Sequence, residues 1–187
     1  MLSKKALNIH QSISWFTDGK ILAHPTEGIW GLGCNALDFD AYSKLFLLKK
    51  RDKKKSFILL CRSLESIKKY TETLSLEDET LLNNAWPGPV TFVINYNSSV
   101  PIHLKNSTGK LAFRVSNHYP IKALLKEFDG LFVSTSANLS GEPPIDSPQK
   151  ILDFFANDNL AYYDEKLGSE VKPSTIIDLE SKKILRR

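Results

Sequence analysis

An uncharged, hydroxyl-rich segment, residues 134–141, reads Ser-Thr-Ser-Ala-Asn-Leu-Ser-Gly. It directly follows the apolar run Leu131-Phe132-Val133, which is typical of the end of a buried strand. Backbone N–H groups in such a turn, helped by serine and threonine hydroxyls, can form a nest for phosphate or carboxylate. A solvated loop has the same composition. The segment therefore predicts an anion site that other residues must support.

The second feature is a basic heptapeptide, residues 49–55, which reads Lys-Lys-Arg-Asp-Lys-Lys-Lys. Its six positive side chains and one negative give +5, whereas the whole chain carries +4, so the other residues sum to −1. The positive excess is confined to one short segment. Such a cluster indicates a polyanionic partner, either nucleotide phosphates or RNA. The alternative is a solvated helix end, where cations favour the helix dipole.

Two more polar groups come at the ends of predicted strands: residues 24–27 (His-Pro-Thr-Glu) and residues 114–116 (Arg-Val-Ser). Ligand sites of α/β proteins gather where strands end and loops begin. The four histidines form no nucleophilic signature, and no metal-ligand spacing is present, so we expect no protein-bound metal. The remaining cations, hydroxyls and carboxamide suit the positioning and charge stabilisation of phosphates.

The bulk composition bounds the class of protein. The 187 residues fit one large domain, with 42% hydrophobic and 25% charged residues. Apolar runs are too short for a membrane span, and the first residues lack the apolar core of a secretory signal, so we expect a cytoplasmic protein. Cys34 and Cys61 provide no disulfide framework and are expected in the core or a pocket wall.

Apolar periodicity predicts helices and strands that interleave along the chain. We expect helices over 6–16, 38–48, 63–70, 75–86, 120–128 and 148–155. We expect strands over 20–23 (leading into His24-Pro25), 57–60, 90–94, 111–115, 131–133, 160–163, 174–178 and 184–186. Asp38 and Ser147 are expected N-caps, and Gly19 is expected to end the first helix. The pattern indicates an α/β (mixed α+β) fold with one mixed sheet flanked by helices.

Two segments rich in glycine or proline interrupt these elements. Gly28, Gly31 and Gly33 are expected to mark a turn and to permit unusual backbone angles or close approach of another chain segment. They are too few for a dinucleotide-binding fingerprint. The segment Trp86-Pro87-Gly88-Pro89 is interpreted as structural, because it ends one helix and starts the next strand.

Taken in order, the polar groups resemble the motifs of the YrdC family of threonylcarbamoyl-AMP synthases, in its short single-domain TsaC type. The resemblance runs from about Lys20 to the C-terminus. Each motif is weak alone, but six in this order are specific. They are Pro25-Thr26-Glu27-x-x-x-Gly31-Leu32-Gly33, Lys49-x-Arg51 with Lys55, Trp86-Pro87-Gly88-Pro89-Val90-Thr91, Arg114-Val115, Ser134 to Gly141, and the tail Pro173 to Asp178 with Ile184-Leu185-Arg186.

The resemblance implies a fold and a reaction. The fold is one YrdC-like domain over residues 1–187, without a second C-terminal domain, whose twisted sheet bears a concave, basic substrate cavity. The reaction converts L-threonine, bicarbonate and ATP into threonylcarbamoyl-AMP and pyrophosphate, with Mg²⁺ carried by the nucleotide. The adenylate passes to a threonylcarbamoyl transferase complex that modifies tRNA beside the anticodon. Direct contact with tRNA is left open, and no membrane is involved.

The resemblance also implies the residues that handle ATP. Lys49, Arg51, Ser136 and Asn138 match the family's Lys-x-Arg and Ser-x-Asn tetrad, and they are expected to be catalytic and to bind ATP. Lys55 matches a basic position that follows, and it is expected at ATP as well. The cations would offset the charge of the triphosphate and of the leaving pyrophosphate. The serine and the asparagine would donate hydrogen bonds to phosphate oxygens.

A second set is implied to bind threonine and bicarbonate. Thr26 matches the threonine of the Pro-Thr-Glu motif, Arg114 matches an arginine that faces the substrates, and Ser134 lies beside the Ser-x-Asn motif. An arginine can hold a carboxylate through two hydrogen bonds, which a lysine cannot copy. The alternative for Arg114 is a salt bridge on a strand face. Glu27 is expected to cap the glycine-rich turn and is left out of the catalytic set.

Some positions depart from the family pattern. Asp52 stands where proline is common, and Ser56-Phe57 replaces the usual entry to the next strand, which leaves the orientation of Lys55 open. The alternative function is an RNA-binding module without catalysis that uses the basic heptapeptide. Against it, no aromatic residues interleave with this cluster as a stacking RNA reader requires.

Overall fold

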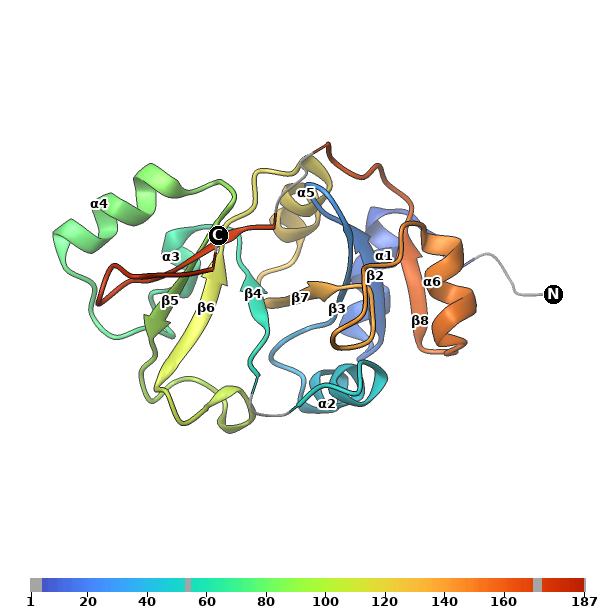
Figure 1. Cartoon of the computed structure of the whole chain (residues 1–187), viewed down its shortest axis with the longest axis horizontal. Helices are drawn as coiled ribbons and strands as arrows, with labels where there is room; N and C mark the ends of the chain where they lie inside the picture. Colours follow the sequence, from blue (N-terminus) through green and yellow to red (C-terminus); the bar gives the residue numbers. More distant parts are fainter. Residues whose placement is uncertain (1–4, 53–54, 170–172, 187) are drawn as a thin grey trace.

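Helices and strands interleave along the computed structural model, which describes residues 5–52, 55–169 and 173–186. The helices are α1 (Ile9–Thr17), α2 (Phe39–Leu48), α3 (Leu64–Ile67), α4 (Leu76–Ala85), α5 (Tyr119–Glu127) and α6 (Pro148–Phe155), with the 3₁₀ turn η1 (Ile102–Leu104). The strands are β1 (Ala6–Leu7), β2 (Ile21–Pro25), β3 (Trp30–Gly33), β4 (Ile58–Leu60), β5 (Val90–Asn95), β6 (Lys110–Arg114), β7 (Phe132–Ser136), β8 (Leu160–Tyr163), β9 (Thr175–Asp178) and β10 (Ile184–Arg186). One sheet flanked by helices results, as predicted (Figure 1).

The sheet is mixed, with the strand order β1-β8-β2-β3-β7-β4-β6-β5-β9-β10. Strand β8 lies parallel to both β1 and β2, and the pairs β4–β6 and β5–β9 are also parallel. The remaining neighbours are antiparallel. Parallel and antiparallel neighbours thus occur in one sheet, which confirms the mixed sheet expected from the sequence.

Local capping sets where the helices begin. The Asp38 side chain accepts a hydrogen bond from the Ala41 N–H at 3.0 Å, and Ser147 caps α6, both as predicted. The first helix starts later than expected, because Asn8 is its N-cap and Ala6–Leu7 join the sheet as the edge strand β1. Gly19 has a φ of +72° after α1, the left-handed conformation that favours glycine at a helix end.

Two strands differ from the sequence-based expectation. The glycine-rich segment predicted as a turn contains strand β3, where Gly31 and Gly33 permit the close approach of other chain segments that was expected as one of their two roles. A Cβ at Gly33 would lie 2.3 Å from the Val133 carbonyl oxygen, and one at Gly31 would lie 2.7 Å from the His24 ring. Strand β7 continues to Ser136, because it pairs with β3 through residues that were expected in a loop.

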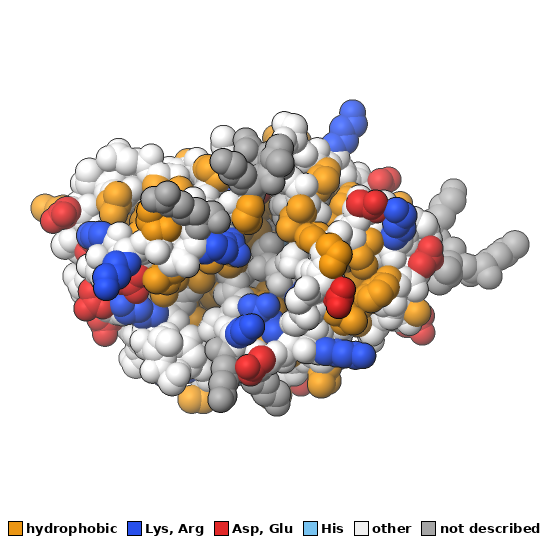
Figure 2. Space-filling view, in the orientation of Figure 1, with side chains coloured by type: hydrophobic (Ala, Val, Ile, Leu, Met, Phe, Trp, Pro, Cys, Tyr) orange, Lys and Arg blue, Asp and Glu red, His pale blue; other side chains and the backbone are white. Residues whose placement is uncertain are grey.

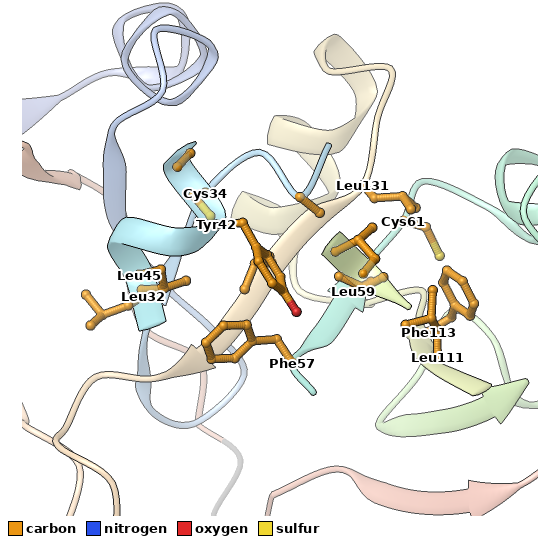
Figure 3. Close-up of a cluster of buried hydrophobic side chains, with 14 of the residues drawn as sticks. Leu32, Cys34, Tyr42, Leu45, Phe57, Leu59, Cys61, Leu111, Phe113 and Leu131 are labelled. Carbon is orange, nitrogen blue, oxygen red and sulfur yellow. The ribbon is translucent and has the colours of Figure 1, made fainter. Parts of the chain in front are cut away.

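Two clusters of buried side chains hold the helices against the sheet. In the smaller one, Phe16 of α1 and Leu124 of α5 pack on Leu22 and Phe132 of the sheet. The larger cluster joins α2 to the central strands. Figure 3 shows part of it, with Leu32, Cys34, Tyr42, Leu45, Phe57, Leu59, Cys61, Leu111, Phe113 and Leu131 labelled. Both cysteines are free and fully buried, as expected, and burial raises the pKa of each thiol.

Candidate functional site

A cavity of about 620 Å³ lies over the middle of the sheet, with walls from strands β3 to β7 and from the C-terminal strands β9 and β10. Figure 2 shows this face hollowed near its middle, with Lys and Arg side chains beside the hollow. On β6, Leu111 and Phe113 are buried while Ala112 and Arg114 alternate with them and line the cavity. Small residues such as Gly31 and Ala112 leave room for a ligand.

The cavity brings together most of the predicted site residues. Five of them line it: Thr26, Arg51, Arg114, Ser134 and Ser136. Three are not part of its wall. Lys49 and Asn138 are buried behind it, and Lys55 is exposed. Residues 53 and 54 of the basic heptapeptide lie outside the described residues.

Arg114 is held from two sides. Its Nη2 donates to Glu27 Oε1 at 2.6 Å, and its Nε donates to the Gly88 carbonyl at 3.0 Å. The Ser116 hydroxyl also donates to Glu27 Oε1 at 2.6 Å. Glu27 therefore orients the guanidinium, a role that the sequence did not reveal. The turn at Trp86–Pro89, interpreted as purely structural, supplies the second anchor.

Arg51 shapes the loop that enters β4. Its Nε donates to the Lys55 carbonyl at 3.0 Å and its Nη2 to the Ser56 carbonyl at 2.9 Å. The guanidinium also lies over the Phe57 ring, 4.9 Å from its centroid. The main chain of Lys55 thus supports Arg51, while a contact of its ammonium with a nucleotide stays a prediction.

The third cation, Lys49, is wholly inside the protein, with 1% of its surface exposed. Its ammonium donates to the Ser136 carbonyl at 2.6 Å, to the Asn138 carbonyl at 2.8 Å and to Asn138 Oδ1 at 3.0 Å. Burial, and secondarily the charge of Arg51, lowers the pKa of Lys49 to about 8. The expectation that this ammonium faces a triphosphate does not match its position.

The turn after β7 differs from the expected anion nest. The N–H groups of Ala137, Asn138 and Ser140 donate to carbonyls of Trp30, Ser136 and Lys49. The Ser136 hydroxyl donates to Asn138 Oδ1 at 2.7 Å, and Asn138 Nδ2 donates to the carbonyl of Glu142. These donors are engaged within the protein because Ala137 and Asn138 are packed inside it, whereas Ser140 and Gly141 are exposed. Gly141 has a φ of +94°, a conformation that favours glycine, at the end of this segment.

Charge at the cavity wall is positive. In the described part of the chain it carries three arginines (Arg51, Arg114 and Arg186) and one carboxylate, Glu27. Burial lowers the pKa of Arg114, and the positive charge of Arg186 adds to this effect, while Glu27 opposes it. Such a wall suits a ligand with more than one negative charge.

A scan against known families matches residues 14–187 with the Sua5/YciO/YrdC family, whose description reads "Telomere recombination". The chain belongs to the Sua5/YciO/YrdC family. This confirms the resemblance drawn from the six sequence motifs.

Curated relatives in this family carry one name. The threonylcarbamoyl-AMP synthase of Chromohalobacter salexigens is 35% identical over 186 residues and covers 100% of both chains. The protein of the same name from Buchnera aphidicola is 37% identical over 171 residues, 90% of each chain. Both names are those of an enzyme, a synthase.

Solved structures share the fold. Sua5 of P. abyssi complexed with L-threonine has a TM-score of 0.81 and 29% identity over 91% of this chain; the match spans 50% of the longer Sua5 chain. YciO of E. coli has a TM-score of 0.82 and 26% identity, covering 96% of this chain and 88% of its own. The family fold thus extends over nearly the whole described chain.

In the frame of this family fold, the structure adds residues that sequence reasoning had left out of the site. Arg186 of β10 lines the cavity, and its guanidinium donates to the Ser174 carbonyl at 2.9 Å and to the Ser174 hydroxyl at 3.2 Å. That hydroxyl in turn pairs with Thr91 Oγ1 at 3.0 Å. The tail motif was noticed in the sequence as a match, but only the folded sheet shows that it closes the cavity.

The described residues contain no group of three or more His, Cys, Asp or Glu side chains arranged to hold a metal ion. None of the helices within these residues is both long and apolar enough to cross a membrane.

Proposed function

We propose that this chain forms threonylcarbamoyl-AMP and pyrophosphate from L-threonine, bicarbonate and ATP. The observation that carries the proposal is the cavity of about 620 Å³ whose wall brings Arg51, Arg114 and Arg186 together with Thr26 and Ser136. The names of the curated relatives and the threonine complex of P. abyssi Sua5 support it.

The reaction has two steps that a sheltered cavity favours. The neutral amine of threonine attacks bicarbonate, which gives a carbamate and releases water. A carbamate oxygen then attacks the α-phosphorus of ATP; the bond to the bridging oxygen breaks, and pyrophosphate leaves. The carbamate decomposes readily in water, so holding it next to the nucleotide gives it time to react.

The wall formed by β6 suits the amino acid. Arg114 is fixed by Glu27 and Gly88, and an arginine fixed in this way can bind the carboxylate of threonine with defined geometry. Thr26 and Ser134 line the same cavity. The Thr26 hydroxyl donates to the Ile29 carbonyl at 2.7 Å, and its oxygen accepts from the N–H groups of Ile29 at 3.3 Å and Gly28 at 3.5 Å, which fixes its position in the wall.

The other cations suit the nucleotide. Arg51 and Arg186 keep a charge that offsets the triphosphate and the pyrophosphate as it leaves. Mg²⁺ fits this site as a companion of the phosphates, because the one carboxylate in the described wall, Glu27, is engaged by Arg114 and Ser116. Bound in this way, the ion would neutralise phosphate charge.

The proposal extends to the biological setting. The adenylate would be handed to a threonylcarbamoyl transferase complex that modifies tRNA beside the anticodon, in the cytoplasm. A mixed anhydride of a carbamate and a phosphate is reactive towards amines, which suits transfer to an exocyclic amine of a base. The chain is proposed to work as a single domain over residues 1–187.

Mass spectrometry tests the proposal directly. The protein is mixed with ATP, Mg²⁺, L-threonine and ¹³C-bicarbonate, and threonylcarbamoyl-AMP with one extra mass unit is expected together with pyrophosphate. Omission of threonine should abolish both products. Folded protein that forms no adenylate under these conditions would contradict the proposal. Tight, salt-sensitive binding of tRNA without adenylate would support the RNA-binding alternative instead.

A further inference from the structure

The ammonium of Lys49 is surrounded by neutral oxygen atoms. All three of its hydrogen atoms have acceptors, two of them main-chain carbonyls of Ser136 and Asn138 and the third the Asn138 side-chain oxygen. No carboxylate lies within 4 Å of it among residues 5–52, 55–169 and 173–186. An uncompensated buried charge is costly, so its acceptors must be held firmly in place.

The contacts continue from Lys49 to the cavity. Asn138 Oδ1 accepts from the Lys49 ammonium and also from the Ser136 hydroxyl. Ser136 is itself a residue of the cavity wall. Because that hydroxyl donates to Asn138, its lone pairs remain for a donor on the ligand. The main chain binds the two segments as well, since the Ser140 N–H donates to the Lys49 carbonyl at 3.4 Å.

We propose that Lys49 is a positioning residue: its buried ammonium clamps the Ser136-Ala137-Asn138 turn from behind and thereby aims the Ser136 hydroxyl at the ligand. This inference rests on the proposed function for its kinetic consequences, but not for the clamp itself. It reverses the role expected from the sequence, in which Lys49 touches the phosphates. In that reading Arg51, two residues later, is the member of the pair that meets the nucleotide.

The clamp has a consequence for pH. A neutral amine has two hydrogen atoms for three acceptors, so loss of the proton releases one contact with the turn. The pKa of about 8 places this loss just above neutrality. Among the described residues, Arg51 is the ionisable group whose charge acts on Lys49, and it lowers that pKa because the charges repel.

Spectroscopy tests the clamp without reference to any activity. In uniformly ¹³C,¹⁵N-labelled protein, the Lys49 side-chain resonance should titrate with a midpoint near pH 8, and resonances of Ser136 and Asn138 should move with the same midpoint. The Lys49→Met variant identifies the resonance and should lose both changes. Lys50→Met is the matched control, because Lys50 is the exposed neighbour. If the turn does not respond while Lys49 titrates, the clamp is disproved.

A double-mutant cycle tests the positioning role in the reaction. Lys49→Met and Asn138→Ala should each lower kcat/KM, and the double variant should be no worse than the poorer single variant by more than about twofold. If Lys49 acts through Asn138, the loss of kcat/KM in the double variant should be smaller than the product of the two single losses by about tenfold or more. If the two residues contact the ligand independently, the two losses should multiply. Multiplicative losses would overturn the inference. If Lys49→Met does not fold, the wild-type titration above still decides.

The two experiments separate this inference from the proposed function. If no threonylcarbamoyl-AMP forms but the Ser136 and Asn138 resonances titrate with Lys49, the proposed reaction is refuted and the clamp remains. If threonylcarbamoyl-AMP forms but these resonances do not respond and the losses in the double variant multiply, the clamp alone is refuted.

Discussion

Two walls of the cavity handle buried positive charge in different ways. On the β6 wall, Arg114 pairs with the Glu27 carboxylate at 2.6 Å. Behind the wall formed by the β7 turn, the ammonium of Lys49 meets only neutral oxygens of Ser136 and Asn138. The first cation keeps its proton at all ordinary pH values, whereas the second has a pKa of about 8.

The difference shows how a cavity obtains fixed positive charge. The arginines lie in the wall itself, where an anionic ligand can compensate their charge, and the Glu27 carboxylate orients one of them, Arg114. The lysine holds backbone in place, because a compact ammonium can bind three oxygens in different directions. Four predictions test this division of roles.

The largest effect is expected from removing Arg51, the cavity-wall cation at the loop that enters β4. Arg51→Met should lower kcat/KM for ATP by about 10²- to 10³-fold, the loss typical of one missing group that stabilises transition-state charge. Rates of pyrophosphate release measure it. The exposed Lys50→Met variant should stay within about twofold of the wild type. A loss below about fivefold for Arg51→Met would place the phosphates elsewhere.

On the β6 wall the largest effect is on stability. Glu27→Gln leaves the partly buried Arg114 without its carboxylate, and breaking an ion pair that is mostly shielded from solvent costs about 3 kcal/mol. Urea unfolding measures the free energy. The exposed pair of Arg62 and Asp129 provides the control, since Asp129→Asn should cost about 0.5 kcal/mol. Equal costs for both changes would mean that Glu27 does not stabilise Arg114.

A pH series distinguishes the two cations. The lowered pKa of Lys49 means that the unfolded chain binds more protons than the folded one between pH 8 and about 10.4, the ordinary value for lysine. The wild-type free energy of unfolding should therefore rise relative to Lys49→Met over this window, by about 1 kcal/mol per pH unit. Activity should fall over the same window. A flat difference would mean that the buried ammonium is not desolvated.

The smallest effect concerns geometry at constant charge. Arg114→Lys keeps a cation but loses the planar fork, so the KM for threonine should rise about tenfold while the KM for ATP changes little. Initial rates at varied threonine and ATP measure both constants. A rise in the KM for ATP alone would mean that Arg114 faces the nucleotide and not the amino acid.

Much of the local structure could be predicted from residue patterns. The caps Asp38 and Ser147 and the glycine after α1 are local signals, and they lie where expected. The strand at residues 30–33 was missed because its glycines also occur in turns. The glycines of this strand differ from turn glycines because other segments lie against them, the Val133 carbonyl at Gly33 and the His24 ring at Gly31. Neither neighbour can be inferred from the local sequence around residues 30–33.

The candidate site was predicted in part. The sequence indicated Arg51, Arg114 and Thr26, which line the cavity. It did not reveal that Glu27 orients Arg114 or that Arg186 is part of the wall. Glu27 and Arg114 are 87 positions apart, and Arg186 is held by Ser174, 12 positions away on the side of the neighbouring strand. No local pattern carries such information.

The sequence by itself determined the family, the mixed α/β class and the set of residues with phosphate-binding chemistry, since these depend on residue types, order and periodicity. The direction in which each cation points was decided only by tertiary structure. Lys49 and Arg51 belong to one basic heptapeptide, yet one is 1% exposed behind the β7 turn and the other lines the cavity. Packing against β7 and β4 separates them, because burial and available acceptors depend on segments far away in the chain.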